Sequence, residues 1–290
     1  MQIVQPSAII IEEELSKLSV YQRIEQCAAI CYQRPAKPTE EESIEFCRSM
    51  AKRGHLTTLE MAQVHLVVYS NYCTMPESKY ITVTLMETQR AHIVSGSIRS
   101  FMEDSSLDGG NIHTFLSLNI PVFFQSTFDT VTPRSVRFAE PHEIPRSHQY
   151  VAVRVICSRA ISHQLVRHRP FSFLQESQRY CRYEDGITVI EPEWAKADET
   201  GRTFTGPEWF SHMMKCESHY QRQLFNGLSP QQARGGLPND TKTELIMYGS
   251  LPMWDHVFDM RCAAGADPEM KRICIPLREE FKARYVGYTK

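Results

Sequence analysis

Two segments of the chain have the alternating, β-branched pattern of strands, and helical patterns surround both of them. The segments read AQVHLVVYS at 62–70 and YVAVRVIC at 150–157. Branched side chains suit a pleated strand and disfavour a helix, so both segments are expected to pair within a sheet. We therefore expect an α+β fold, with a mixed or antiparallel sheet flanked by helices. One domain would span 1–290, with an insertion at about 71–149.

Helical periodicity covers much of the remaining chain. Thr39 followed by Glu42 predicts a capping box at the start of one helix, and Gly54 predicts its end. Ser158 is expected to cap another helix that reaches about Arg167, after which Pro170 predicts a loop. A short strand is expected at 187–190. The other expected helices lie at 13–32, 207–224, from Ser229, 243–258 and 268–281.

A weak internal similarity links two distant segments. IVSGSIRSF at 93–101 resembles IMYGSLPMW at 246–254, and the first reads as a strand end that enters a helix. The simpler interpretation is that both are ordinary Gly-Ser entries into helices. A true repeat is the alternative.

Charge and hydropathy exclude several classes of protein. The formal net charge is -2 over 290 residues, so no basic field is available to attract nucleic acid. No apolar run is long enough for a transmembrane helix, and the N-terminal segment does not match a secretory signal. We therefore expect a cytoplasmic protein that does not bind membranes. The nine cysteines contain no CxxC pair, which predicts free, mostly buried thiols and no metal site.

The densest cluster of polar side chains is RHRPFSFLQESQRY, at 167–180. Arginine offers planar, paired donors for phosphate, and glutamine and serine can hydrogen-bond a base or a sugar. Phenylalanines, Leu174 and Tyr180 interleave the charges, which favours partial burial over a fully solvated basic turn. The residues alone therefore indicate an anion or nucleotide site.

This run resembles the signature of flavin-dependent thymidylate synthases, in which Arg-His-Arg is followed after seven residues by Ser. Arg167, His168, Arg169 and Ser177 have that spacing. Four further blocks resemble the family in the same order along the chain: the segment 53–60 with a Gly-His-x-x-x-x-Glu pattern, Gln164, Arg234 ahead of Leu237-Pro238, and the segment LIMYGSLPMWDHVFDMR, which ends at Arg261.

The resemblance implies that the protein converts dUMP to dTMP. FAD reduced by NADPH would supply hydride, and 5,10-methylenetetrahydrofolate would supply the carbon. It also implies a homotetramer that binds FAD between subunits, with dUMP, folate and NADPH as its small-molecule ligands. The family fold would explain why the sequence has neither a GxGxxG motif nor a phosphate-binding P-loop.

The resemblance also implies roles for individual residues. Arg261 would be catalytic, contacting the uracil edge and stabilising charge that develops on the ring. The residues expected to bind substrate are Gln164, Gln175, Ser177, Gln178, Arg179, Arg234 and Arg261, with the phosphate held by Arg179 and Arg234. The residues expected to bind cofactor are His55, Glu60, Arg167, His168, Arg169, Ser172, Ser250 and His256.

Three positions depart from the family pattern. Ser250 and Pro252 stand where Asn and Arg are expected, and Asp267 stands where His is expected. Since those positions help to hold flavin in the family, the departures predict altered flavin contacts. One hypothesis is that Arg99, in the predicted insertion, replaces the missing arginine.

Three alternative functions follow from these departures and from the loop itself. A flavin- and folate-dependent pyrimidine nucleotide hydroxymethyltransferase would transfer the same carbon but finish with water. A non-catalytic homologue would keep the nucleotide pocket and lose flavin. An RNA- or nucleotide-binding module would use the 167–179 loop without catalysis, although the near-neutral charge disfavours extended nucleic-acid binding.

Overall fold

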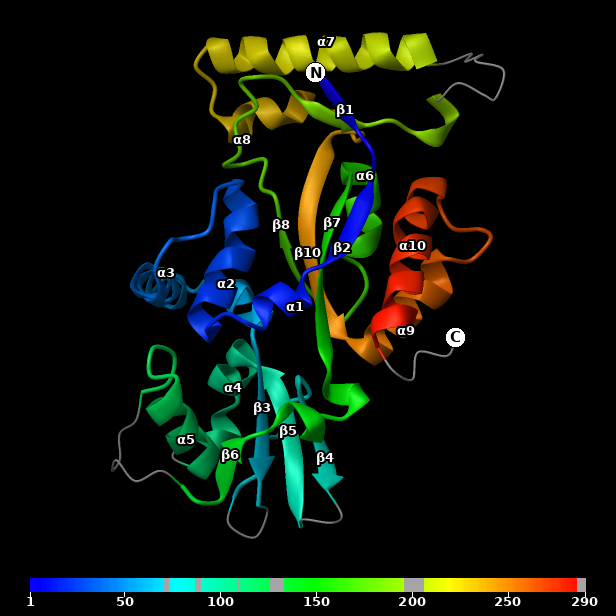
Figure 1. Cartoon of the computed structure of the whole chain (residues 1–290). Coiled ribbons are helices and arrows are strands. Elements are labelled where there is room, and N and C mark those ends of the chain that lie inside the picture. The colour runs from blue at the N-terminus through cyan, green and yellow to red at the C-terminus, as the bar shows by residue number, and fades with distance from the viewer. Residues whose placement is uncertain (70–72, 87–89, 109, 126–132, 196–205, 286–290) are drawn as a thin grey trace.

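The computed structural model describes residues 1–69, 73–86, 90–108, 110–125, 133–195 and 206–285. Two four-stranded antiparallel sheets form the middle and the lower part of the molecule in Figure 1, and a two-stranded sheet lies under a long helix at the top. Helices cover the sheets, which confirms the α+β class and the antiparallel sheets expected from the sequence.

The central sheet has the strand order β2-β7-β10-β8, and every neighbouring pair is antiparallel. Its strands are β2 (Ser7–Ile10), β7 (Tyr150–Ser158), β8 (Ser172–Gln175) and β10 (Lys242–Ser250). One face packs against α6 (Arg159–Leu165), α9 (Leu251–Arg261) and α10 (Pro268–Arg284), around a core that includes Trp254 and Phe281. We call this the α9 face.

The opposite face of the central sheet packs against the N-terminal helices, and we call it the α2 face. Ala152, Leu174, Ile246 and Tyr248 lie on it, in one cluster with Met61. The elements on this side are α1 (Glu12–Leu15), α2 (Val20–Ala29), η1 (Ile30–Tyr32) and η2 (Leu56–Met61), with α3 (Glu40–Lys52) packed on α2.

The lower sheet has the strand order β4-β5-β3-β6 and is also antiparallel throughout. Its strands are β3 (Gln63–Val68), β4 (Ile81–Met86), β5 (Ala91–Ser97) and β6 (Val136–Phe138). Its helical elements are α4 (Ile98–Glu103), η4 (Ser105–Leu107) and α5 (Asn111–Asn119). The short turns η5 (Pro141–Glu143) and η6 (Arg146–His148) then lead the chain back to the central sheet.

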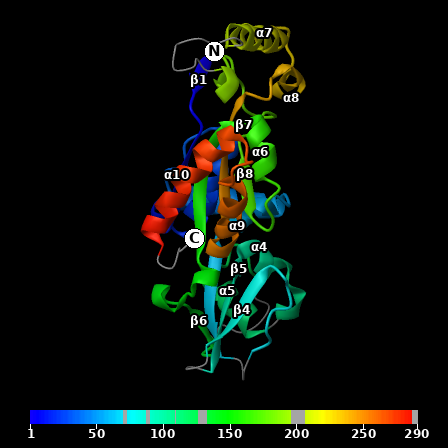
Figure 2. The ribbon, with the colours of Figure 1, turned by 90° about the vertical axis from the view of Figure 1, so that its right-hand side faces the viewer.

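The top of the molecule is a small separate layer. β1 (Gln2–Val4) pairs in parallel with β9 (Thr188–Ile190), and α7 (Gly206–Phe225) lies across them. Figure 2 shows α7 at one end of the elongated molecule and β4 at the other. Trp209, Met213 and Tyr220 of α7 are buried, whereas Cys216 is only half-buried. The layer also contains η7 (Glu193–Ala195), α8 (Pro230–Ala233) and η8 (Arg234–Gly236).

Several local predictions are confirmed. β3 lies within the predicted segment 62–70, and β9 lies within 187–190. β7 covers the predicted segment 150–157 and extends one residue further, to Ser158. The Thr39 hydroxyl caps α3 by accepting a hydrogen bond from the backbone N–H of Glu42. The predicted capping box is only half formed, because the Glu42 carboxylate accepts from the Thr39 hydroxyl and not from its backbone N–H. Ser158 caps α6 by accepting from the N–H of Ile161. The helices expected at 207–224 and 268–281 are α7 and α10.

Three predictions were wrong. The expected helix at 243–258 is two elements, β10 and then α9, with the change at Ser250. The expected helix at 13–32 is interrupted, because Ser19 and Gln22 form a capping box that starts α2 afresh. The expected loop after Pro170 contains β8, an edge strand paired with β10. Among the described residues, no helix is long and apolar enough to cross a membrane.

Candidate functional site

The predicted catalytic arginine lies at the C-terminal end of α9 and contacts two other predicted site residues. Arg261 donates from Nε to Nε2 of His168 at 2.9 Å. It also donates from Nη1 to Oε1 of Gln164 at 3.1 Å and from Nη2 to the backbone oxygen of Gln164 at 3.3 Å. The end of α6 and the loop after it therefore hold one guanidinium at three points.

This contact fixes the protonation state of His168. The imidazole is buried, and its Nε2 accepts a hydrogen bond from Nε of Arg261, so the ring is neutral with its own proton on Nδ1. Burial first, and then the charges of Arg261 and His256, lower the pKa of His168 to about 4. His168 is thus a neutral acceptor throughout the physiological range.

The start of α9 contains the predicted cofactor residue Ser250. Ser250 is buried and is the N-cap residue of α9, with its backbone N–H 3.4 Å from Sδ of Met253. Pro252 occupies the first turn, where a missing N–H costs the helix nothing. His256 is exposed on the next turn, with its ring centroid 6.1 Å from that of His168.

The residues predicted to bind the nucleotide continue from β8 into the following turn. Gln175 donates from Nε2 to the Thr243 hydroxyl at 3.1 Å. The Ser177 hydroxyl accepts from the backbone N–H of Arg179 at 3.3 Å, and Gln178 between them is half-buried. Arg179 is exposed and donates from Nε to Oε1 of Gln231, on α8, at 3.1 Å.

Arg234, the second predicted phosphate ligand, is the C-cap residue of the same short helix and is exposed. The contact between Arg179 and Gln231 therefore brings the turn after β8 to the helix that carries Arg234. Two exposed arginines on adjoining elements suit a dianionic phosphate.

The residues predicted to bind cofactor fall into two groups. Arg167 and Arg169 are exposed on the loop between α6 and β8, and their charges suit the pyrophosphate of FAD. His55 is exposed directly ahead of η2, and Glu60 lies within it. η2 packs against β8 on the α2 face, where Ser172 lies opposite Tyr248. Glu60 accepts from Nη1 of Arg99 at 2.8 Å.

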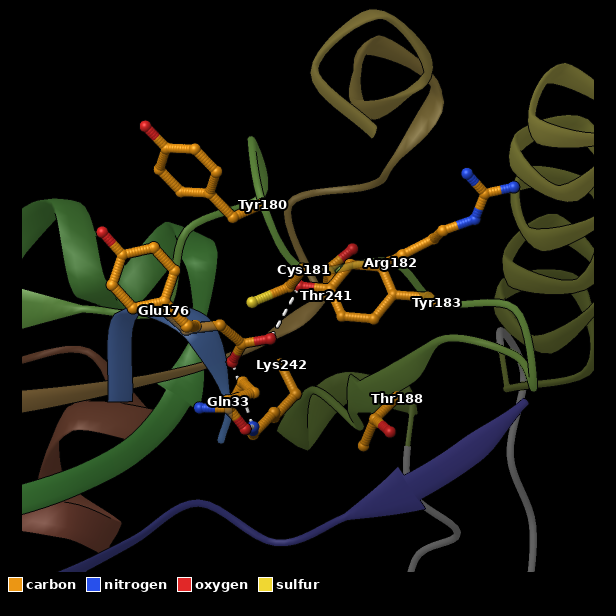
Figure 3. A pocket seen from close by; sticks show the side chains of 10 residues that line it. Gln33, Glu176, Tyr180, Cys181, Arg182, Tyr183, Thr188, Thr241 and Lys242 are labelled. Carbon is orange, nitrogen blue, oxygen red and sulfur yellow. Dashed lines mark hydrogen bonds and ion pairs between the residues drawn. The ribbon is translucent and has the colours of Figure 1, made fainter. Parts of the chain in front are cut away.

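A pocket of ≈ 340 Å³ opens beside the predicted nucleotide turn (Figure 3). Its lining includes Tyr32, Gln33, Glu176, Arg182, Tyr183 and Lys242. Glu176 is buried and accepts from the Tyr183 hydroxyl at 2.7 Å and from Nζ of Lys242 at 3.0 Å. None of the predicted site residues lines this pocket. Glu176 thus lines the pocket, whereas its neighbour Gln175 lies outside the pocket lining and bonds to Thr243.

Sequence reasoning missed Glu176 and Lys242, although Glu176 lies within the signature run itself. Lys242 also contacts Oε2 of Glu244 at 3.2 Å, and burial of these charges requires such pairing. The signal available in the sequence was the alternation of Lys242 and Glu244 along a strand, which the helical interpretation of 243–258 concealed.

All nine cysteines are free, and five of them are buried: Cys27, Cys47, Cys157, Cys181 and Cys274. Within the described ranges, no group of three or more His, Cys, Asp or Glu side chains is placed to hold a metal ion.

Comparison with known proteins shows that the part of the chain that contains most of these residues matches a protein family. The family model described as "Thymidylate synthase complementing protein" matches residues 132–285, which contain β7, the 167–180 run and α9. The segment 53–60, with His55 and Glu60, lies outside that match.

Three relatives are each described as a flavin-dependent thymidylate synthase. The protein from Mycobacterium marinum is 33% identical over 141 residues, covering 43% of this chain and 54% of the relative. The one from Geobacter sulfurreducens is 34% identical over 121 residues, covering 41% and 50%. The one from Mycobacterium tuberculosis is 31% identical over 136 residues, covering 43% and 54%. The chain spans about half the length of these relatives. Since the family model covers more than half of the chain, the protein belongs to the thymidylate synthase complementing protein family.

Proposed function

We propose that the protein is a flavin-dependent thymidylate synthase that converts dUMP to dTMP. The observation that carries the proposal is the contact of Arg261 with Gln164 and His168, within the matched family region. A guanidinium held at three points is preorganised to stabilise negative charge on a substrate. The neutral His168 adds no competing positive charge beside it.

The remaining predicted residues would bind and orient the ligands. Arg179 and Arg234 would hold the phosphate of dUMP, and Gln164, Gln175, Ser177 and Gln178 would complete its pocket. Arg167, His168, Arg169, Ser172, Ser250, His256, His55 and Glu60 would contact FAD. When bound, FAD reduced by NADPH supplies hydride and 5,10-methylenetetrahydrofolate supplies the carbon. The fold would place these groups, with sites shared between subunits of a homotetramer.

The donor chemistry of the exposed loop fits an anionic cofactor. Arg167 and Arg169 present two guanidinium groups on either side of His168, next to Ser172. Such groups bind phosphates in pairs of hydrogen bonds, so the pyrophosphate of FAD is a suitable partner. A hydroxymethyltransferase remains the second candidate, because Pro252 brings no donor to the start of α9.

Ligand binding and turnover together test the proposal. Purified protein should bind FAD, seen as a visible absorbance band that remains with it on gel filtration. It should also bind dUMP in calorimetry, and Arg261→Ala should abolish turnover more than it weakens dUMP binding. A protein that binds neither ligand would contradict the proposal.

A further inference from the structure

The two four-stranded sheets have the same construction. In each, a first central strand, an edge strand, a second central strand and a helix come in this order along the chain. The central sheet has further elements between them: α6 after its first central strand, and β9, α7 and α8 after its edge strand. The lower sheet uses β3, β4, β5 and α4, and the central sheet uses β7, β8, β10 and α9. The edge strand pairs with the second central strand in both cases, antiparallel. The weak similarity of 93–101 to 246–254 is therefore part of a repeated topology.

The register agrees residue by residue. The first residue of β3, Gln63, pairs with Ser97, and the first residue of β7, Tyr150, pairs with Ser250. Both serines are N-cap residues of the following helix. The next backbone N–H donates to the residue before the first strand in each unit: Ile98 to Ala62 at 3.1 Å, and Leu251 to Gln149 at 2.9 Å.

Packing at the turn is also repeated. Gly96 and Gly249 precede the two serines, and a Cβ on either would clash with a side chain at the start of the edge strand: Ile81, the first residue of β4, at 2.9 Å, and Phe171, the residue before β8, at 2.5 Å. A Cβ on Gly96 would also lie 2.6 Å from the Ser100 hydroxyl. Four residues after each serine stands a buried aromatic ring, Phe101 or Trp254. An ordinary Gly-Ser helix entry does not require these further matches.

The two units also pack against each other reciprocally. β2 precedes the lower unit in sequence but pairs with β7, whereas β6 precedes the central unit but pairs with β3. η2, ahead of β3, packs on β8 of the other unit. In turn His148 of η6, ahead of β7, shares a 2.8 Å hydrogen bond with Thr84 of β4.

The units differ in the charged groups they carry. The central unit has α6 and the Arg167–Arg169 loop between its first central strand and its edge strand, whereas the described residues between β3 and β4 of the lower unit form no helix. The helix of the central unit, α9, ends at Arg261, whereas the helix of the lower unit, α4, ends at Glu103. The lower unit has Arg99 two residues after its serine, where the central unit has Pro252. It has Glu60 three residues before its first strand, where the central unit has Ser147.

Glu60 and Arg99 form an ion pair between η2 and α4, whereas the equivalent elements of the central unit, η6 and α9, are joined by an ion pair of Arg146 with Asp255 at 2.9 Å. Arg99 donates from Nη1 to Glu60 at 2.8 Å and from Nε to Glu103 at 3.0 Å. The Arg99 and Glu60 side chains are 32% and 25% exposed, so both can still reach a ligand. Glu60 belongs to η2, which packs on β8 next to the loop of Arg167 and Arg169.

We propose that residues 55–103 are a second copy of the unit formed by 142–261, and that its Glu60–Arg99 pair binds FAD in place of Ser147 and Pro252. This inference rests on the proposed function. A guanidinium can donate to a phosphate or a ring carbonyl of the cofactor, and a carboxylate can accept from its hydroxyl groups. The central unit keeps the nucleotide-binding groups and its own cofactor residues, and the lower unit adds Arg99 at the position that Pro252 occupies in the central unit.

Titration of the full-length protein with FAD, followed by flavin fluorescence, tests this assignment. Arg99→Ala should raise the Kd for FAD at least tenfold, and Arg99→Lys less, while the Kd for dUMP changes less than twofold. Glu103→Gln is the matched control, because it removes the exposed partner of Arg99 and leaves Glu60 in place. Its Kd for FAD should stay within twofold of the wild type.

A charge exchange separates cofactor binding from a purely structural ion pair. The double variant Glu60→Arg, Arg99→Glu restores an ion pair with its charges exchanged. Its circular dichroism spectrum and melting temperature should therefore match those of the wild type. FAD affinity should remain at least tenfold weakened. The inference would be overturned if this double variant bound FAD as tightly as the wild type, or if Arg99→Ala left FAD affinity unchanged. Either result would leave the proposed function standing. A wild type that does not bind FAD would overturn the proposed function as well.

Discussion

Arg261 and His168 are joined by a hydrogen bond of 2.9 Å between Nε of the guanidinium and Nε2 of the imidazole. The bond links the last residue of α9 to the loop that follows α6. It requires a neutral imidazole, and burial together with the charge of Arg261 keeps the ring neutral by lowering its pKa to about 4. His168 is therefore expected to position Arg261.

Replacing His168 by Phe keeps the ring volume but removes the acceptor. The Nε–H of Arg261 then loses its partner, so we expect turnover to fall at least tenfold and stability to fall by about 1–3 kcal/mol. His168→Gln can present an amide oxygen to Arg261 and should retain more of both. Steady-state rates and urea unfolding measure the two effects. Equal turnover in the Phe and Gln variants would contradict a positioning role.

Arg179 and Arg234 are expected to act on the phosphate and not on the base. Removal of either, as Arg179→Ala or Arg234→Ala, should weaken dUMP binding by about 1.5–3 kcal/mol, because each loses charge-assisted hydrogen bonds. Deoxyuridine, which lacks the phosphate, should bind the variants and the wild type equally. Isothermal calorimetry with both ligands measures this, with exposed Arg182→Ala as the control. A parallel loss of deoxyuridine affinity would count against the assignment.

A polar network in the lower sheet predicts sensitivity to acid. Ser95 Oγ lies 2.8 Å from Nδ1 of both His65 and His148. Burial, followed by the charges of His148 and Arg23, lowers the pKa of His65 to about 4, and burial lowers the pKa of His148. Both histidines are neutral in the folded protein at pH values where the unfolded chain binds protons.

The stability that the neutral His65 ring contributes is present above pH 6.5 and is lost as the pH falls from 6.5 to about 4. For His65 the loss should reach up to about 3 kcal/mol, at 1.36 kcal/mol per pKa unit. Unfolding free energies measured between pH 4 and 8 should show this slope, and His65→Gln should flatten it. His142→Gln, at an exposed histidine, should leave the slope unchanged. A wild type with no slope would refute the network's role.

Gly249 lies at the turn from β10 into α9, against the ring of Phe171. A Cβ at this position would lie 2.5 Å from that ring, so Gly249→Ala should destabilise the protein by about 1–3 kcal/mol. A second change, Phe171→Leu, should recover part of the loss. Gly235→Ala, where nothing lies within 4 Å, is the control and should change stability by less than about 0.5 kcal/mol. Denaturant midpoints distinguish these outcomes.

Local signals predicted those elements whose ends are set by their own side chains. Thr39 and Ser158 cap their helices as the sequence indicates, and the branched residues of β7 form a strand. The residues Gln164, His168 and Arg261 meet although 97 positions separate the first from the last, and only the family resemblance grouped them. Their contact depends on the packing of α9 against α6, which periodicity does not specify.

The elements that were mispredicted depend on tertiary contacts. Residues Thr243 to Ser250 of β10 are all buried, so the strand shows no alternation, and its Glu, Leu and Met also suit a helix. β8 has four residues and is stabilised by pairing with β10. The two sheets are equivalent in strand register and hydrogen bonding, which the sequence does not reveal. The only trace of the equivalence that we found in the sequence is the short similarity of 93–101 to 246–254.

The product formed from dUMP tests the central claim most directly. Protein is incubated without oxygen with dUMP, 5,10-methylenetetrahydrofolate, FAD and NADPH, and the nucleotide is analysed by mass spectrometry. We predict dTMP that appears only when flavin and NADPH are both present and that is lost in Arg261→Ala. A hydroxymethyl product would move the enzyme to the second candidate function. Unchanged dUMP under complete conditions would contradict the account.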